Sequence, residues 1–375
     1  MTNRARSWVE VSLDAVTANF TLLKQAVGPA VEVMAVVKAD AYNHGAAAVS
    51  AALQAAGGRY FAVAGAEEGA ALREAGIGGS ILLLGGVLPF EYELALNYNL
   101  TPVLHSPSEL LAFEEFAARH GRRLAYHFKI DTGLGRLGSR AGAEEIAAAV
   151  RRASHCDLEG LMTHFASSEN FADPSCGRQQ EAFDEMRRRL GAFVTPSTRL
   201  HLSNSAAVVY GRRRAWQSMV RAGLALYGYV PPACGIPPAT LEGLRPALTW
   251  KARVLAVKEM AAGSPIGYGG TFRAPANLRI AVIAAGYADG YPHCLGNRGA
   301  VVVKGRLAPV VGAVSMDLIT ADVTDCPAVA AGDTVTLLGG ESGCVMDAVE
   351  MARRAGAIPY VILCGIGRRV ARLHC

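Results

Sequence analysis

This sequence of 375 residues contains cysteines but no pattern that pairs them. The eight cysteines are scattered, and no two have the C-x-x-C spacing. Their arrangement argues against a zinc site and against a disulfide framework, so we expect no bound metal and a reducing compartment. The chain also lacks any run of about 18 apolar residues, and residues 1–14 contain no apolar signal-peptide core. We therefore expect a cytoplasmic protein with no membrane partner.

Charge is also sparse and nearly balanced. Charged residues make up 18% of the chain, and the formal net charge is +5. The basic runs at 187–189 and 212–214 are short and have no interleaved aromatics, which is typical of a solvated surface rather than of a nucleic-acid site. By contrast, 51% of the residues are apolar. The chain can therefore bury a large interior, and its length favours two domains. From the charge pattern we expect no nucleic-acid partner.

The first part of the chain alternates short apolar strands with helical patterns. Ser106 to Glu109 form a capping box, and Gly57, Gly76 and Gly121 stand where helices should end. Strands are predicted at 31–38, 59–64, 80–84, 101–104, 124–130, 157–163, 199–203 and 217–222. This succession of β-then-α units predicts an α/β fold with a (β/α)8 TIM-type barrel. A doubly wound open sheet is the alternative, but its Gly-rich dinucleotide turn is missing after the first strand.

A Pro-rich segment at residues 230–238 is typical of a linker. Beyond it the helical patterns largely stop. Strands are predicted at 250–260, 278–285, 300–303, 308–311 and 334–338, with glycine turns between them. The strand predicted at 8–11 precedes the barrel and could join this second sheet. We expect a barrel domain at 12–232 and a mostly β C-terminal domain at 240–375, together with the N-terminal strand in 1–11.

Reactive side chains follow the predicted barrel strands, where such barrels place their sites. Lys38 ends the first strand, although a lysine there could also extend its ammonium into water. Ser205 opens the helix after the seventh strand, and Gly223 follows the eighth. Those are the two positions at which barrels commonly bind phosphate. A buried lysine across from a phosphate site is what pyridoxal phosphate needs, so this cofactor is predicted.

Several blocks of sequence, in order, are similar to the motifs of one enzyme family. The block Ala35–Gly45, which contains Lys38, resembles the lysine motif of bacterial alanine racemases. The later blocks are Lys129–Gly138, Thr163–Phe165, His201–Ala206, Arg221–Gly228, Tyr268–Phe272, Gly286–Gly290, Met316–Asp317, and Tyr360 with Arg369 and Arg372. The resemblance covers essentially the whole chain. It implies a (β/α)8 barrel plus a β domain, working as a homodimer in which the second domain completes the partner's active site.

The resemblance also implies an activity, the racemisation of L- and D-alanine, which would supply D-alanine for peptidoglycan. Lys38 would hold pyridoxal phosphate and then act as one base for the α-proton. Tyr268 of the partner subunit would be the second base on the opposite face, because racemisation removes a proton from one face and returns it to the other. Arg136 and the backbone N–H of Met316 would bind the carboxylate of a small amino acid. Lys129, which is often carbamylated in this family, would help to fix Arg136.

Further roles are implied for the residues around the cofactor. An arginine beside the ring nitrogen disfavours a second positive charge there, and Arg221 stands at that position. His164 and His201 would support Arg221 and the ring. The implied phosphate ligands are Tyr42, Ser205, Gly223, Leu224 and Tyr360, with Asn204 next to Ser205, while Tyr287 and Asp317 are expected to support the site.

Simpler interpretations stand beside these roles. Tyr268 could be a surface tyrosine in a glycine-rich turn, and Lys129, Asp131 and Arg136 could form an ordinary ion-pair network. Outside the family context His164 and His201 would be structural histidines. Only a structural role is expected for His44, His105, His120 and His155.

Three residues depart from the family pattern. Asn43 stands where glycine is usual, His293 where arginine is common, and Val361 where the family often has glutamate. These departures could change substrate entry or size preference, so a serine or broad-specificity racemase remains an alternative. A barrel-fold pyridoxal-phosphate decarboxylase is a more distant one. A single-domain pyridoxal-phosphate carrier protein would be excluded if residues 240–375 fold.

Overall fold

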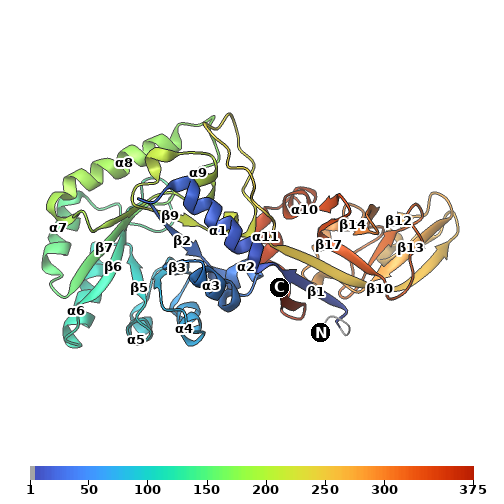
Figure 1. Ribbon diagram of the computed structural model, residues 1–375, viewed down its shortest axis with the longest axis horizontal. Helices are drawn as coiled ribbons and strands as arrows, with labels where there is room; N and C mark the ends of the chain where they lie inside the picture. Colours follow the sequence, from blue (N-terminus) through green and yellow to red (C-terminus); the bar gives the residue numbers. More distant parts are fainter. Residues whose placement is uncertain (1–4) are drawn as a thin grey trace. The chain divides into compact units, whose positions relative to one another are not determined.

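The structure is a computed structural model that describes residues 5–375 (Figure 1). It contains two compact units. One unit comprises residues 16–41 and 46–245, and the other comprises the chain up to Ala15, residues 42–45 and residues 246–375. Within the described residues, no helix is both long enough and apolar enough to cross a membrane.

Eight parallel strands form the centre of the first unit. They are β2 (Glu32–Val36), β3 (Tyr60–Val63), β4 (Ser80–Leu83), β5 (Thr101–Leu104), β6 (Leu124–Lys129), β7 (Cys156–Met162), β8 (Arg199–His201) and β9 (Met219–Ala222). Neighbouring strands follow the chain order from β2 to β8, and β9 pairs with β2. The N–H of Arg221 donates to Ser203 O at 2.9 Å and links β9 to the end of β8. The predicted (β/α)8 barrel is confirmed, and the doubly wound alternative is wrong because the strand order never reverses.

Helices alternate with these strands and cover their outer side, as α4 to α8 show in Figure 1. They are α1 (Leu13–Val27), α3 (Ala46–Ala55), α4 (Ala66–Glu74), α5 (Tyr92–Asn97), α6 (Pro107–Arg119), α7 (Ala143–Arg152), α8 (Ser175–Leu190) and α9 (Ser205–Val209). Ser106 caps α6 by accepting the N–H of Glu109 at 3.1 Å, as its motif predicts. Gly57, Gly76 and Gly121 all have positive φ, so they end helices in the left-handed conformation expected of them.

A left-handed turn directly follows β2, and nothing in the sequence predicted it. The segment α2 (Lys38–Asn43) has φ between 52° and 65° at five successive residues, Ala39 to Asn43. Such backbone costs roughly 1–2 kcal/mol per non-glycine residue and is rarely continuous. The carboxylate of Glu68 accepts the N–H of Ala39 at 2.7 Å, and that of Asp40 accepts the N–H of Ala46 at 2.7 Å. These bonds offset part of the strain in the turn, which begins at Lys38, a residue predicted to belong to the active site.

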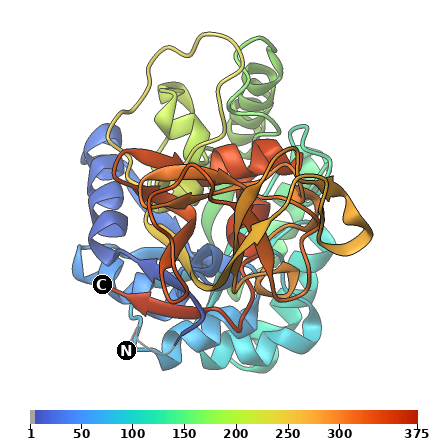
Figure 2. The ribbon, with the colours of Figure 1, turned by 90° about the vertical axis from the view of Figure 1, so that its right-hand side faces the viewer.

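The second unit is mostly β, as predicted. Its strands are β1 (Ser7–Val11), β10 (Leu248–Met260), β11 (Pro265–Ile266), β12 (Phe272–Arg273), β13 (Leu278–Ile283), β14 (Ala300–Val303), β15 (Arg306–Pro309), β16 (Ile319–Asp322), β17 (Thr334–Glu341), β18 (Cys344–Met346) and β19 (Ala371–His374). The main sheet has the order β15-β14-β17-β10-β1-β19. The N-terminal strand β1 thus joins this sheet, antiparallel to β10 and parallel to β19 (Figure 2, blue beside red).

Sequence patterns missed several elements of this unit. The strand expected at 308–311 begins earlier, as β15, and two short helices, α10 (Ala348–Ala355) and α11 (Pro359–Cys364), were not predicted. Both helices nevertheless carry local signals. Asp347 caps α10 by accepting the N–H of Glu350 at 2.8 Å, and Pro359 occupies the first position of α11. α10 is also amphipathic, with Ala348, Met351 and Ala352 buried on one side, so its helical periodicity was a further signal in the sequence.

Candidate active site

Arg221 lies on β9 inside the barrel unit and is only 3% exposed. Its Nη1 donates to the carbonyl oxygen of His201 at 2.7 Å and to Nδ1 of the same residue at 3.0 Å. Its Nη2 donates to the carbonyl oxygens of Thr163 and Leu202 at 2.8 and 3.0 Å and to Nδ1 of His164 at 2.9 Å. Burial lowers the pKa of Arg221 to about 9, so the side chain is still charged at neutral pH. A cation is therefore held in the barrel by neutral acceptors.

These bonds determine the protonation of the neighbouring histidines. A guanidinium has only donors, so Nδ1 of His164 and Nδ1 of His201 must both accept, and each ring carries its proton on Nε2. Nε2 of His201 lies 2.8 Å from Nδ1 of His127 and donates to it. Burial, followed by nearby positive charge or a neighbouring histidine, lowers the pKa values of His164 and His201 well below the usual range. Burial also lowers the pKa of His127, to about 3. All three rings are neutral.

His127 was not among the residues predicted for the site. It lies on β6, two positions before Lys129, and both side chains are buried. Residues two apart on a strand share a face, so the spacing of His127 and Lys129 could have revealed it. Gly160 on the neighbouring strand β7 makes room for the ring, because a Cβ there would lie 2.4 Å from Nδ1 of His127.

Lys129 is 4% exposed at the end of β6. Burial, together with the charges of Arg221 and Arg136, lowers the pKa of Lys129 to about 8. At that pKa roughly a tenth of this amine is unprotonated at pH 7, far more than for an ordinary lysine, and the unprotonated amine is a nucleophile.

The loop that carries Arg136 is organised by Asp131. Its Oδ1 accepts the N–H groups of Gly133, Leu134 and Gly135 at 3.0–3.1 Å, and its Oδ2 accepts from Nε of Arg140 at 2.8 Å. Burial opposes ionisation, but these donors lower the pKa of Asp131 to about 2. The alternative in which Asp131 pairs with Arg136 is wrong. The loop folds back so that Ser139 bonds to residues 129 and 131, which brings Arg140 to the carboxylate and leaves Arg136 exposed.

The two predicted phosphate positions of the barrel come together. Oγ of Ser205 accepts the N–H groups of Gly223 and Ala225 at 3.0 and 3.1 Å. Both lone pairs are then occupied, so toward any further group this hydroxyl can only donate. Oδ1 of Asn204 caps α9 through the N–H of Ala207 at 3.1 Å. A buried donor beside the backbone of Gly223 and Leu224 fits a phosphate acceptor.

Tyr42 and Tyr360 lie in the second unit, with ring centroids 5.8 Å apart. Tyr42 is buried at the end of the left-handed turn, and Tyr360 belongs to the first turn of α11. Burial raises the pKa of Tyr42 far above its usual value, and Tyr360 and Cys364 reinforce the shift. Its hydroxyl therefore keeps its proton and remains a hydrogen-bond donor.

Tyr268 is 78% exposed, on a tight turn between β11 and β12. The flanking Gly267 and Gly269 have φ of 75° and 68°, which suits a short connection where other residues would be strained. Ile266 at the base of the turn is buried against Leu278, and both belong to a small apolar cluster. The turn is thus anchored while its tyrosine projects into solvent.

Met316 is also exposed, and the network around it is charged. The carbonyl oxygen of Met316 accepts the N–H of Ala288 at 3.0 Å, in the loop that contains Tyr287. Arg369 bonds to both oxygens of Asp289 at 2.7 and 2.9 Å and to Asp317 at 2.8 Å. The structure therefore joins the blocks around Tyr287, Met316 and Arg369 in one cluster.

Comparison with known proteins identifies the family. Models of the alanine racemase N-terminal and C-terminal domains match residues 11–231 and 247–374. The chain is 40% identical over 367 residues to the alanine racemase of Halothermothrix orenii, covering 98% of this chain and 96% of the relative. It is 39% identical over 378 residues to that of Geobacter sulfurreducens, covering 97% and 96%. The chain belongs to the alanine racemase family.

Solved structures of alanine racemases have the same fold. The enzyme from Bartonella henselae, with covalently bound pyridoxal phosphate, superposes with a TM-score of 0.88 at 29% identity, covering 99% of this chain and 100% of that one. The enzyme from Bacillus anthracis, with bound L-Ala-P, has a TM-score of 0.88 at 31% identity and covers 99% and 95%. The resemblance inferred from the motifs is confirmed, and the single-domain carrier alternative is wrong because residues 246–375 fold.

The departures from the alanine racemase pattern have different surroundings. His293 is exposed, and its ring lies 6.0 Å from that of Tyr287, while Val361 is an exposed residue of α11. Asn43 instead donates hydrogen bonds to carbonyl oxygens at the end of α11. The four histidines expected to be structural each have a hydrogen-bond partner in the protein: His44 bonds to Tyr42 O, His105 to Glu109, His120 to Glu93 and His155 to Glu114.

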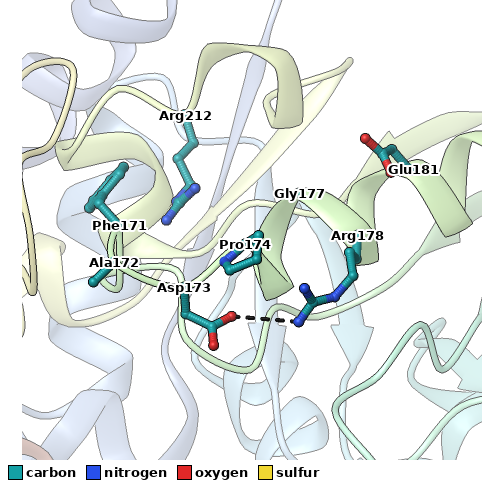
Figure 3. Close-up of a pocket in the computed structure, with 8 residues that line it drawn as sticks. All are labelled: Phe171, Ala172, Asp173, Pro174, Gly177, Arg178, Glu181 and Arg212. Carbon is teal, nitrogen blue, oxygen red and sulfur yellow. Dashed lines mark ion pairs between the residues drawn. The ribbon is translucent and has the colours of Figure 1, made fainter.

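A cavity of about 480 Å³ lies elsewhere on the barrel unit of this alanine racemase family member (Figure 3). Both of its arginines have partners, because Arg178 pairs with Asp173 at 3.7 Å and Arg212 stacks on the ring of Phe171 at 3.9 Å. Arg212 also donates to the carbonyl oxygens of Ser168 and Asn170. None of the predicted site residues lines this cavity, so we assign no function to it.

Proposed function

We propose that this chain is a pyridoxal-phosphate-dependent alanine racemase that interconverts L- and D-alanine. The observation that carries the proposal is the match to alanine racemases over nearly the whole length of the chain. It acts as a cytoplasmic homodimer and supplies D-alanine for peptidoglycan. Residues 12–232 form the cofactor-binding domain, and residues 240–375 with the strand in 1–11 complete the active site of the partner.

Pyridoxal phosphate, when bound, supplies an electron sink that makes the α-proton of an amino acid removable. Lys38 holds the cofactor covalently and moves the proton on one face of the substrate. Tyr268 of the partner subunit moves the proton on the other face, so a proton can leave one side and return to the other. An exposed tyrosine on an anchored turn, 78% accessible in its own chain, supports this role.

The barrel residues bind and orient the cofactor. Ser205 with the backbone of Gly223 and Leu224, and Tyr42 with Tyr360, hold the phosphate, with Asn204 in support. With the cofactor bound, Arg221 would lie beside the ring nitrogen, where its charge would keep that nitrogen unprotonated. His164 and His201 hold the guanidinium, and their neutral rings add no second charge beside it.

Arg136 and the N–H of Met316 of the partner subunit bind the substrate carboxylate, and Tyr287 and Asp317 support that side of the site. The neutral amine of Lys129 adds to carbon dioxide, which forms an N–C bond and releases one proton. The resulting carbamate anion orients Arg136. Burial and the lowered pKa of about 8 support this modification, because an ammonium could not react.

A direct test uses the purified protein. Incubation with single L-amino acids, followed by chiral chromatography, should yield D-alanine from L-alanine. Borohydride reduction and peptide mapping should find the cofactor on Lys38, and Lys38→Ala should abolish both results while Lys24→Ala, a change at an exposed lysine, leaves them intact. A faster reaction with L-serine would favour the broad-specificity alternative. Carbon dioxide release without a D-product would contradict racemisation.

A further inference from the structure

The side chain of Asn43 binds the end of a distant helix. Its Nδ2 lies 3.1 Å from Leu363 O, 2.7 Å from Cys364 O and 3.0 Å from Ile366 O. Three carbonyl oxygens around one atom identify that atom as the amide nitrogen, since the amide oxygen would be repelled there. All four residues belong to the second unit, although some 320 positions separate Asn43 from the helix.

Asn43 is an additional donor at the end of this helix. The N–H of Ile366 also reaches Leu363 O, at 3.4 Å, and Nη2 of Arg372 donates to Ile366 O at 2.9 Å. The last carbonyls of a helix have no partner within it, and α11 ends at Cys364. The N–H of Gly365 already bonds to Val361 O at 2.9 Å, so the amide of Asn43 serves the carbonyls that come after it. Asn43 is therefore a cap for α11 that comes from another part of the chain.

The capped helix and the left-handed turn each carry a tyrosine. Tyr42 immediately precedes Asn43, and Tyr360 lies in α11, with the two rings 5.8 Å apart. We propose that Asn43 is a positioning residue that fixes Tyr42 relative to Tyr360 and thereby controls how firmly the cofactor phosphate is held. This inference rests on the proposed function, in which both tyrosines bind that phosphate.

Glycine, the usual residue of the family here, could not do the same. It adopts the φ of 65° found at Asn43 without strain, but it has no amide to donate. Asparagine tolerates this conformation better than most residues and adds the bonds to α11. Asparagine in place of glycine thus keeps the turn and adds hydrogen bonds that connect the segment of Tyr42 to the helix of Tyr360.

The test compares Asn43→Gly with the wild-type holoenzyme. Asn99→Gly is the matched control, since Asn99 is exposed and has a φ of 50°. Release of pyridoxal phosphate is followed by absorbance after dilution, and affinities are measured for pyridoxal phosphate and for pyridoxal, which lacks the phosphate. We expect Asn43→Gly to release pyridoxal phosphate about tenfold faster, the equivalent of about one lost hydrogen bond, with pyridoxal affinity unchanged.

Asn43→Asp extends the test, because a carboxylate facing three carbonyl oxygens should weaken phosphate retention further than glycine does. Equal losses for pyridoxal phosphate and pyridoxal, or no loss for either, would overturn the inference while leaving the racemase assignment intact. A wild-type protein that binds no pyridoxal phosphate at Lys38 would overturn both.

Discussion

Arg221 donates from Nη1 to Nδ1 of His201 over 3.0 Å inside the barrel unit. Because arginine cannot accept, this bond places the proton of His201 on Nε2, which in turn donates to His127. The buried Arg221 cation therefore determines which ring nitrogen carries the proton in His201 and, through it, in His127. The consequence is that His127, which bonds to His201 rather than to the guanidinium, should affect the orientation of Arg221.

We expect His127→Leu to lower kcat/KM for alanine by about 30-fold, because a buried His201 N–H without an acceptor costs about 2 kcal/mol. His127→Gln, which restores an acceptor oxygen, should recover part of the loss. His120→Leu, at a partly exposed histidine that bonds to Glu93, is the control and should change little. Equal activity of the leucine and glutamine variants would show that the hydrogen bond is unimportant.

The neutral histidines should also make the protein sensitive to acid. The pKa values of His127, His164 and His201 are lower in the folded state than the usual 6.5. Below pH 6.5 the unfolded chain therefore binds more protons, so stability is complete above this pH and falls as the pH decreases. Each histidine adds a slope of up to about 1.4 kcal/mol per pH unit.

Urea unfolding between pH 3 and pH 8 measures this effect. For His127, whose folded pKa is about 3, the loss should continue down to that pH. His127→Gln should show a shallower decline than the wild type. A stability that stays constant from pH 7 to pH 5 would contradict the neutral assignment.

Lys129 should react with carbon dioxide. The pKa of Lys129 is lowered to about 8, so its neutral, reactive fraction increases as the pH rises toward 8. Carbon-13 NMR in labelled bicarbonate should therefore show a carbamate signal that grows over this range and is absent in Lys129→Gln. Lys24→Gln, at an exposed lysine, should retain it. The Lys129→Gln variant should have a raised KM for alanine with a smaller change in kcat, because Arg136 loses its orienting anion. A wild-type spectrum without the signal would refute the modification.

The two bases should come from different chains. Mixing an inactive Lys38→Ala homodimer with an inactive Tyr268→Ala homodimer, under conditions that allow exchange, should restore activity, since one site of each mixed dimer then has both residues. Light scattering and a mass-tagged subunit establish whether dimers form and exchange. Exchange without recovered activity would disprove the shared site.

Tyr268→Phe should slow racemisation in both directions, because each base is the acid for the other. With α-deuterated alanine, exchange of the label with solvent should persist better from the enantiomer that faces Lys38. Tyr98→Phe, which removes a surface hydroxyl that bonds to Glu74, is the matched control. Equal loss of exchange from both enantiomers would argue against bases on opposite faces.

The sequence by itself determined the barrel, the mostly β unit and the strand-end position of the predicted barrel residues. Buried parallel strands are short apolar runs, and each leaves its own local pattern. The pattern of apolar and polar residues was therefore enough to place Lys38, Lys129 and Arg221 at or near strand ends. The motifs around them were local as well, which is why the family resemblance was visible.

Only the tertiary structure decided how these residues meet. His127 bonds to a residue 74 positions away, Asp131 takes Arg140 rather than Arg136, and Asn43 reaches α11 across 320 positions. Such hydrogen bonds depend on how strands and loops come together, and they leave no periodicity in the sequence. The left-handed turn from Ala39 to Asn43 is the clearest case. Local preference disfavours that backbone at non-glycine positions, and the bonds of Ala39 to Glu68 and of Asn43 to α11, which the local sequence does not show, help to stabilise it.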